Sequence, residues 1–64
     1  MTTYTSRELR TIGKENGKQW GASLVALEVN KDKSVTFLYD KDGERFTSTL
    51  QSCELKDYNK VIGK

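Results

Sequence analysis

The chain has 64 residues, of which 34% are hydrophobic and 31% are charged, with a formal net charge of +2 and no histidine. A chain this short forms one domain with a small core, and its single cysteine excludes an internal disulfide. Without histidine, Ser-His-Asp and Cys-His catalysis is excluded, and so is a zinc site of the usual nitrogen and sulfur type. We therefore expect a protein that is not an enzyme and that uses no cofactor and no metal.

The sequence contains no stretch typical of targeting or of membrane insertion. The residues after Met1 are polar, unlike the basic and then apolar start of a signal peptide. The longest apolar run, residues 24–27, is far shorter than the roughly 20 residues of a membrane span. A lone cysteine also fits a reducing compartment better than a secreted one. We expect a stand-alone cytoplasmic protein without a membrane partner.

Residues 1–19 are predicted to form a helical prefix. Thr5 and Glu8 have the spacing of a capping box, in which the Thr hydroxyl accepts a free backbone N–H and the Glu side chain reaches back. Leu9 and Ile12 share one face of such a helix. Because a short helix is unstable alone, we expect these two side chains to dock on a sheet.

Two glycines bear on the length of this prefix. Gly13 weakens a helix and Gly17 would end it, which limits the helix to about two to three turns. An irregular loop over residues 12–17 is the alternative. The spacing Gly13-x-x-x-Gly17-Lys18 differs from that of a phosphate-binding loop and no strand precedes it, so we interpret it as a helix end.

Residues 20–64 are predicted to form a β-barrel or meander that makes one domain with the prefix. Apolar and polar residues alternate over three segments, as in strands with one buried face. The three segments are residues 22–29, 34–39 and 44–51. Polar turns separate them at residues 30–33 and 40–43, and Asp42-Gly43 is the stronger turn signal because Gly accepts a positive φ.

Each predicted strand has one face directed at the core. The inward residues are Val25, Leu27 and Val29 in the first strand, Val35, Phe37 and Tyr39 in the second, and Phe46, Ser48 and Leu50 in the third. Leu24 and Ala26 make the other face of the first strand partly apolar. That strand is therefore expected to be covered on both sides at one end.

The chain after residue 50 is predicted to continue as β structure. Cys53 and Leu55 resume the apolar alternation with a change of phase, which indicates a bulge or bend near residues 51–52. Cys53 is then a small buried hydrophobic residue rather than a reactive thiol. Residues 61–62 are interpreted as a short last strand that closes a barrel.

A series of motifs covers residues 20–55. In chain order they are Trp20-x-Ala22, Leu27-Glu28-Val29, Val35-x-Phe37-x-Tyr39-Asp40-x-Asp42-Gly43-x-Arg45, Leu50 and Leu55. This order resembles the Tudor and other SH3-like small barrels. The resemblance implies a mainly β fold, an SH3-like barrel or strongly bent antiparallel sheet of roughly three to five strands, with a short N-terminal helix.

The same resemblance implies a kind of ligand. Tudor domains hold methylated Lys or Arg in an aromatic cage. Trp20, Tyr39 and Phe46 are the matching positions here, and a second aromatic residue beside Tyr39 is absent. SH3-like barrels of bacterial and phage proteins more often bind nucleic acid or the enzymes that process it.

Charge is distributed unevenly along the chain. The net charge is +2 over residues 1–20, −2 over residues 21–55 and +2 over residues 56–64. An anion-binding surface is therefore expected to involve the prefix and the tail rather than the strands. Asp40, Asp42 and Glu44 lie around one turn but lack the spacing of a calcium loop, so we interpret them as a solvated turn.

The leading hypothesis is a small non-enzymatic binding module that associates with nucleic acid or with a nucleic-acid-processing protein. Lys and Arg side chains would contact phosphates, and an exposed ring would stack on a base. The candidate residues for nucleic-acid or partner binding are Arg7, Arg10, Lys14, Lys18, Trp20, Tyr39, Arg45, Lys56, Tyr58 and Lys60.

Two other hypotheses remain open. The chain could be a protein-binding adaptor or an inhibitor of the phage type, with an exposed sheet edge that accepts a partner strand. It could instead be a subunit of a larger assembly, a homo-oligomer included, since a chain of this size has little core of its own.

Overall fold

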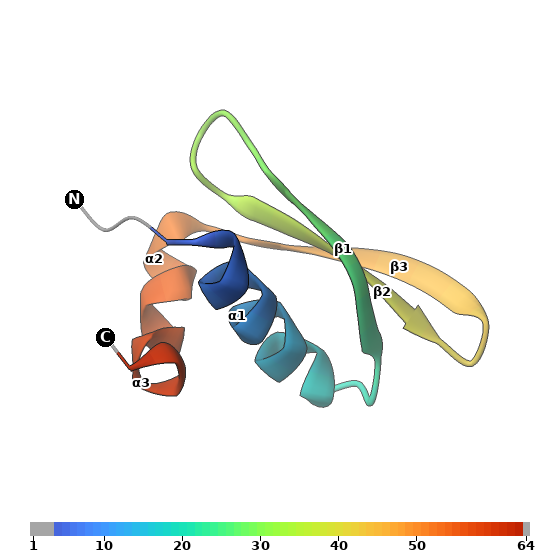
Figure 1. Cartoon of the computed structure of the whole chain (residues 1–64). Helices are drawn as coiled ribbons and strands as arrows, with labels where there is room; N and C mark the ends of the chain where they lie inside the picture. Colours follow the sequence, from blue (N-terminus) through green and yellow to red (C-terminus); the bar gives the residue numbers. More distant parts are fainter. Residues whose placement is uncertain (1–3, 64) are drawn as a thin grey trace.

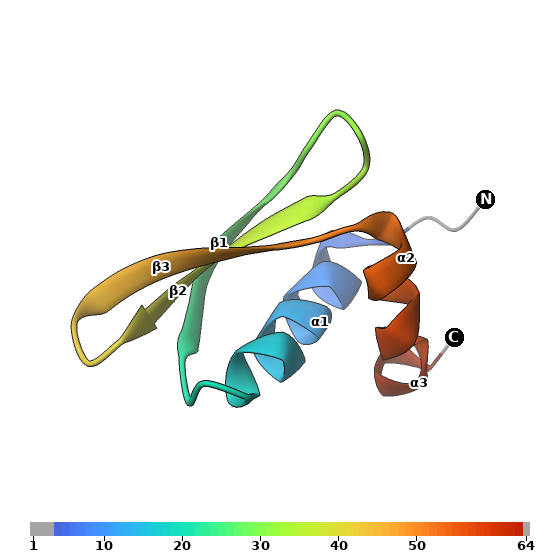
Figure 2. The ribbon, with the colours of Figure 1, turned by 180° about the vertical axis from the view of Figure 1, so that it is seen from behind.

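A computed structural model describes residues 4–63 of the chain (Figure 1). Its elements, in chain order, are helix α1 (Ser6–Lys18), strands β1 (Ser23–Val29), β2 (Val35–Lys41) and β3 (Glu44–Leu50), helix α2 (Ser52–Leu55), the 3-10 turn η1 (Lys56–Tyr58) and helix α3 (Asn59–Ile62). The strands form one antiparallel sheet in the order β1-β2-β3. Helix α1 and the C-terminal helical segment lie on the same side of this sheet, as both ribbon views show (Figures 1 and 2). None of the helices in residues 4–63 has the length and apolar character of a membrane-crossing segment.

The fold is a mixture of helix and strand rather than a mainly β barrel. Helices hold 40% and strands 35% of the described residues, and the three-stranded sheet is open. The predicted N-terminal helix and antiparallel sheet are confirmed, but residues 61–62 are helical and close no barrel. The buried or half-buried residues Leu55, Tyr58 and Ile62 recur every three to four positions, which is the period of a helix and not of a strand.

The start of this C-terminal segment also corrects two predictions. Helix α2 begins at Ser52, so no bulge interrupts a strand there, and the backbone N–H of Gln51 donates to Glu54 Oε1 at 3.0 Å. Cys53 is exposed on α2. Leu55 is buried instead, because residues two positions apart point to different sides of a helix but to the same side of a strand.

Helix α1 begins as the sequence predicts. The backbone N–H of Glu8 donates to Thr5 Oγ1 at 3.2 Å, and the N–H of Thr5 donates to Glu8 Oε1 at 2.9 Å, so the capping box is confirmed. Leu9 and Ile12 are buried against the sheet. The helix has 13 residues and ends at Lys18, directly after Gly17, so the predicted helix end is confirmed, and Gly13 does not interrupt the helix.

Gly13 and Gly17 are places where the aromatic residues of β2 approach the helix closely. A Cβ on Gly13 would lie 2.6 Å from Cδ1 of Phe37, and one on Gly17 would lie 2.7 Å from Cε1 of Tyr39. These distances are shorter than carbon atoms tolerate, so any side chain would push α1 away from the sheet. The two glycines are one helical turn apart and form a flat stripe for the two rings.

The two hairpin turns agree with the sequence. Asp42 and Gly43 have φ values of 53° and 85° and connect β2 to β3 as a two-residue turn. In the first hairpin, Asn30 N–H donates to Ser34 O at 2.8 Å and Lys33 has a φ of 71°. This is a three-residue loop with a left-handed residue at its end, which matches the twist of the two strands.

The faces of β2 and β3 are also as predicted, but β1 contains a bulge. Leu24 pairs with Tyr39 and Ala26 pairs with Leu38, so Val25 has no partner on β2. The extra residue reverses the phase of the strand. Leu24 therefore faces α1 with Leu27, and Val25, predicted to point into the core, is 46% exposed.

One core joins the prefix to the rest of the chain. Its buried members are Leu9, Ile12, Val35, Phe37, Tyr39, Leu50 and Leu55. Helix α1, strands β2 and β3 and helix α2 all contribute to this cluster, so in the described residues the prefix and the sheet share one core.

The glycine stripe yields a stability prediction. Gly13→Ala and Gly17→Ala are each expected to lower the free energy of unfolding by about 1–2 kcal/mol, because overpacking exceeds the gain in helix propensity. Urea unfolding measures the change. Lys14→Ala, at an exposed position of the same helix, is the control and should stay within about 0.5 kcal/mol. A stabilised Gly13→Ala variant would show that the helix does not need this close approach.

Candidate binding site

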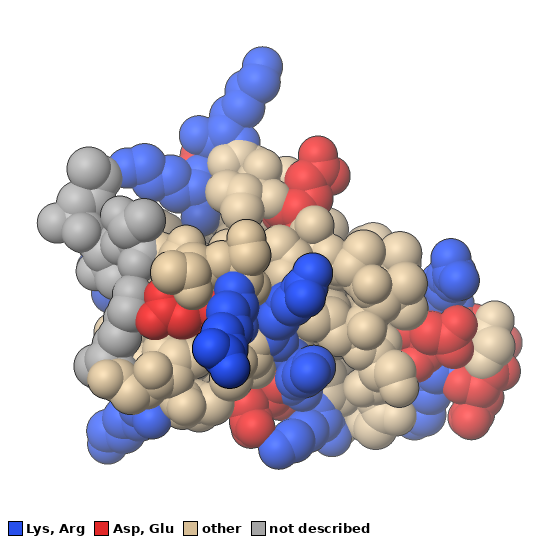
Figure 3. Space-filling model, viewed as in Figure 1, with Lys and Arg blue, Asp and Glu red and all other residues tan. Residues whose placement is uncertain are grey.

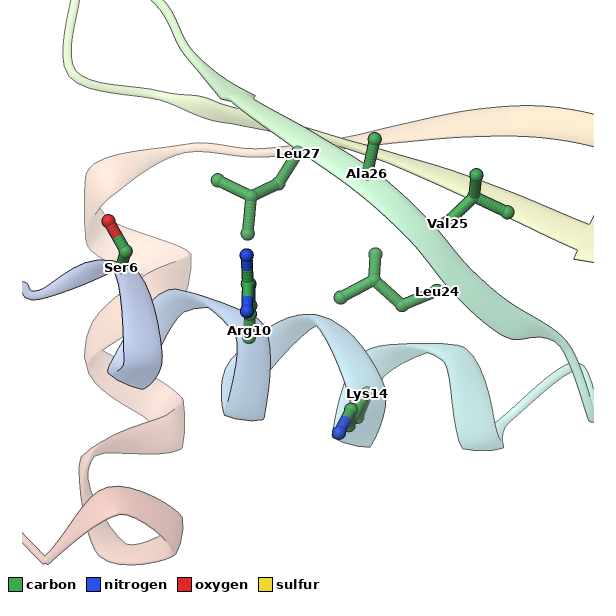
Figure 4. A pocket seen from close by; sticks show the side chains of 7 residues that line it. All are labelled: Ser6, Arg10, Lys14, Leu24, Val25, Ala26 and Leu27. Atoms are coloured by element: carbon green, nitrogen blue, oxygen red, sulfur yellow. The ribbon is translucent and has the colours of Figure 1, made fainter.

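A groove lies between α1 and β1 (Figure 4). It has a volume of about 550 Å³ and is lined by Ser6, Arg10, Lys14, Leu24, Val25, Ala26 and Leu27. Leu24 and Leu27 point from β1 toward the helix, and Arg10 and Lys14 project from successive turns of α1 below them (Figure 4). The groove therefore has an apolar wall and a cationic rim.

One edge of β1 borders this groove and pairs with nothing in residues 4–63. Asn30 N–H points to β2, where it donates to Ser34 O at 2.8 Å. Hydrogen bonding alternates along an antiparallel ladder, so the N–H and C=O groups of Leu27 and Val29 point the opposite way, toward the free edge. The edge thus offers backbone donors and acceptors to a further strand.

Exposed apolar side chains gather on the same strand. The large hydrophobic residues that the structure shows as exposed are Val25 (46%), Val29 (57%) and Val61 (45%). The first two lie on β1. Both polar backbone groups and apolar side chains of this strand are therefore exposed to solvent. The combination is typical of a surface that another molecule covers.

The outer face of α1 carries a basic row of Arg7, Arg10, Lys14 and Lys18, all exposed. Their spacing of three or four residues places them on one stripe of the helix, about 16 Å long. Lys18 Nζ lies 2.7 Å from Glu15 Oε1, which offsets the last of these charges. In Figure 3, Lys and Arg side chains gather over the part of the surface that α1 forms.

The aromatic candidate residues lie elsewhere, inside the fold. Tyr39 is buried and Trp20 is half-buried. The Trp20 ring packs edge-on against Tyr39 at 5.7 Å and against Phe46 at 5.5 Å. These three rings contact one another beneath the sheet, so they contribute to the core and not to a stacking surface beside the basic row.

The remaining candidate residues are dispersed. Arg45 lies on the helix-free face of the sheet, where its Nε is 3.7 Å from Asp40 Oδ2. Lys56 and Lys60 are exposed on the C-terminal segment, and Tyr58 is half-buried there. The structure therefore brings together only the four cations of α1.

A buried hydrogen-bond network centred on Asn16 ties the helix, the sheet and the C-terminal segment together. Asn16 is 3% exposed. Its Nδ2 donates to the Tyr39 hydroxyl at 3.1 Å, and its Oδ1 accepts from the Tyr58 hydroxyl at 3.1 Å. The Tyr39 hydroxyl in turn donates to Gly13 O at 2.7 Å.

Sequence reasoning missed this network, although one signal was present. Asn16 is four residues after Ile12, on the apolar stripe of the helix, and a polar residue in that position needs buried partners. The network stabilises the fold and offers no chemistry of its own. In residues 4–63, no three His, Cys, Asp or Glu side chains are gathered where they could hold a metal ion.

Comparisons with protein-family models, with curated proteins and with solved structures found no match to this chain. The function is therefore inferred from three features of the surface, which are the groove, the free edge of β1 and the basic row.

The Asn16 network yields a prediction about pH. Burial raises the pKa of the Tyr39 hydroxyl above its usual value, against a smaller opposite effect of the hydrogen bond from Asn16. Tyr39 ionises in the unfolded chain above about pH 10 but resists ionisation in the folded one. The free energy of unfolding should therefore be unaffected by this group below pH 10 and fall as the pH rises further.

The variant Tyr39→Phe tests whether the Tyr39 hydroxyl causes this pH dependence of the free energy of unfolding. The variant should lose about 1–3 kcal/mol at neutral pH, because Asn16 Nδ2 and Gly13 O lose a partner. Its stability should then fall less steeply above about pH 10 than that of the wild type. Urea unfolding across this pH range measures both effects, and the same slope in the two proteins would contradict the assignment.

Proposed function

We propose that this chain is a non-enzymatic protein-binding module and that its partner adds an extended segment to the free edge of β1. The observation that carries the proposal is the edge of β1 beside a groove, which pairs with no other strand in the part of the chain that the structure describes. The backbone groups of Leu27 and Val29 point to that edge and would bond a partner strand, as in other proteins that bind by strand addition.

The two edges of the sheet differ in a way that favours β1. Strand β3, at the other edge, begins with Glu44 and Arg45, and its outward residues Thr47 and Thr49 are polar. Charged and polar residues are typical of an edge that avoids pairing. Strand β1 instead exposes two valines and carries Glu28 as its only charged residue.

The bulge sets the length of the available edge. It interrupts the ladder between Leu24 and Ala26, so regular pairing is confined to residues 26–29. A partner segment would therefore pair over about four residues, and such a short edge suits a selective complex better than open-ended aggregation.

Nucleic-acid binding is the second candidate, and the basic row supports it. Four exposed cations on a rigid helix could contact successive phosphates. The described structure places no exposed ring beside them, so this mode would consist of backbone contact without base stacking.

Strand addition is tested with short peptides. Displayed random dodecapeptides are selected on the immobilised full chain, and amide hydrogen exchange is then followed by NMR with a selected peptide. We expect slower exchange at the Leu27 and Val29 amides, because their N–H groups become hydrogen-bonded. Absence of enriched peptides, or protection of these amides by a second copy of the chain at high concentration without peptide, would overturn the proposal.

Val29→Pro sharpens this test. The substitution removes an N–H that faces the free edge, so β1 keeps its bonds to β2. Peptide affinity should fall at least about tenfold, which corresponds to about 1.4 kcal/mol for a lost hydrogen bond and a distorted edge. Val29→Ala keeps the backbone donor and is the matched control, with a smaller loss expected. Equal effects of the two variants would show that the side chain, not strand addition, binds the peptide.

The second candidate makes a separate prediction. The double substitution Arg7→Glu and Lys18→Glu reverses the ends of the basic row and leaves the groove intact. If the row binds nucleic acid, the affinity for short duplex and single-stranded DNA and RNA falls, and its salt dependence becomes shallower. Lys56→Glu with Lys60→Glu changes the net charge equally and is the control. Equal effects of the two double variants would exclude a specific role for the row.

A further inference from the structure

We infer that the segment accepted by β1 is acidic on alternate residues, with its carboxylates directed at Arg10 and Lys14. This inference rests on the proposed strand addition and names the chemistry of the partner. The evidence is the cationic rim of the groove, where both side chains line the space beside the free edge (Figure 4).

Arg10 and Lys14 have no acidic partner within residues 4–63. The ion pairs of the described structure join Lys18 to Glu15 and Arg45 to Asp40. Both groove cations are exposed and project from α1. A ligand carboxylate would therefore meet charges that no acidic group in residues 4–63 neutralises.

The spacing of the two cations fits an extended chain. They are four residues apart on α1, which is about 6 Å along the helix axis. Alternate residues of a strand lie about 6.6 Å apart and point to the same face. Two carboxylates at alternate positions of an added strand could thus reach both cations together, because β1 runs above α1 at an angle (Figure 4).

The opposite face of the added strand would meet different neighbours. On the helix-free face of the sheet, β1 presents Ala26 and Glu28. An acidic residue beside Glu28 is disfavoured, since like charges on neighbouring strands repel. The pattern expected of the segment is therefore acidic on the side of α1 and neutral or basic on the other, not uniformly acidic.

The apolar wall of the groove adds a further requirement. Leu24 and Leu27 are half-buried and point toward α1. The aliphatic part of a Glu side chain, or an apolar residue at a neighbouring helix-facing position, would cover them. The charges then select the partner, while the backbone bonds and the apolar contact supply most of the affinity.

The test compares peptides selected on the wild type with those selected on the Arg10→Glu and Lys14→Glu double variant. We expect Asp and Glu to be enriched at alternate positions with the wild type, and Lys and Arg at the same positions with the variant. A peptide selected on the wild type should bind the variant at least about tenfold more weakly, since two attractions become two repulsions. Lys56→Glu with Lys60→Glu, which changes the net charge equally outside the groove, should keep both the pattern and the affinity.

The outcomes separate this inference from the proposed function. Selected peptides that protect the Leu27 and Val29 amides but lack alternating acidic residues would overturn the inference and leave strand addition in place. A wild type that selects no peptide but binds duplex or single-stranded nucleic acid through Arg10 and Lys14 would overturn both. If the charge-reversed variant does not fold, Arg10→Gln with Lys14→Gln serves instead, and an unchanged preference for acidic residues in that variant would contradict the inference.

Discussion

The packing of two aromatic rings on two glycines determines how this molecule is put together. A Cβ atom on Gly13 would lie only 2.6 Å from the Phe37 ring, and a Cβ atom on Gly17 would lie only 2.7 Å from the Tyr39 ring. The absence of both Cβ atoms allows α1 to approach β2 more closely than a helix with side chains could. The close approach brings the Tyr39 hydroxyl to the helix backbone, and there it must find partners because it is buried. Gly13 O and Asn16 supply them, and Asn16 extends the network to the C-terminal segment.

The same contact also determines the position of the groove beside β1. With the glycine stripe turned to β2, the residues one position further along, such as Lys14, are rotated by about 100° around the helix axis. That rotation places the basic side of α1 next to β1, one edge of which pairs with no strand among residues 4–63. A side chain at Gly13 or Gly17 would therefore disturb the groove as well as the core. The stability of the fold and the geometry of the groove depend on the same few atoms.

The parts of the fold that follow local rules could be predicted from the sequence, and the parts that depend on distant contacts could not. The capping box at Thr5, the turn at Asp42-Gly43 and the faces of β2 and β3 each depend on neighbouring residues. The bulge at Val25 depends on the register with β2, and the role of Gly13 depends on rings more than 20 positions away. The C-terminal segment is predicted as β structure but is helical, because a short apolar pattern is compatible with both the period of a helix and the period of a strand. For the surface, the sequence predicted the four cations of α1 but not the groove beside them, since a groove exists only once two elements are packed.

The bulge allows two residues of β1 to face α1 that could not both do so in a regular strand. Leu24 must face α1 to cover the core, and Leu27 must do so as well, but residues three positions apart point to opposite faces of a regular strand. Inserting Val25 as an unpaired residue lets both leucines face the helix. The consequence is a valine that is 46% exposed and an edge that is regular only beyond it, over residues 26–29. Cations on one side of that short edge and Glu28 on the other would disfavour a segment with the opposite charge pattern. The bulge that completes the core would thus also limit which segments could pair with this edge.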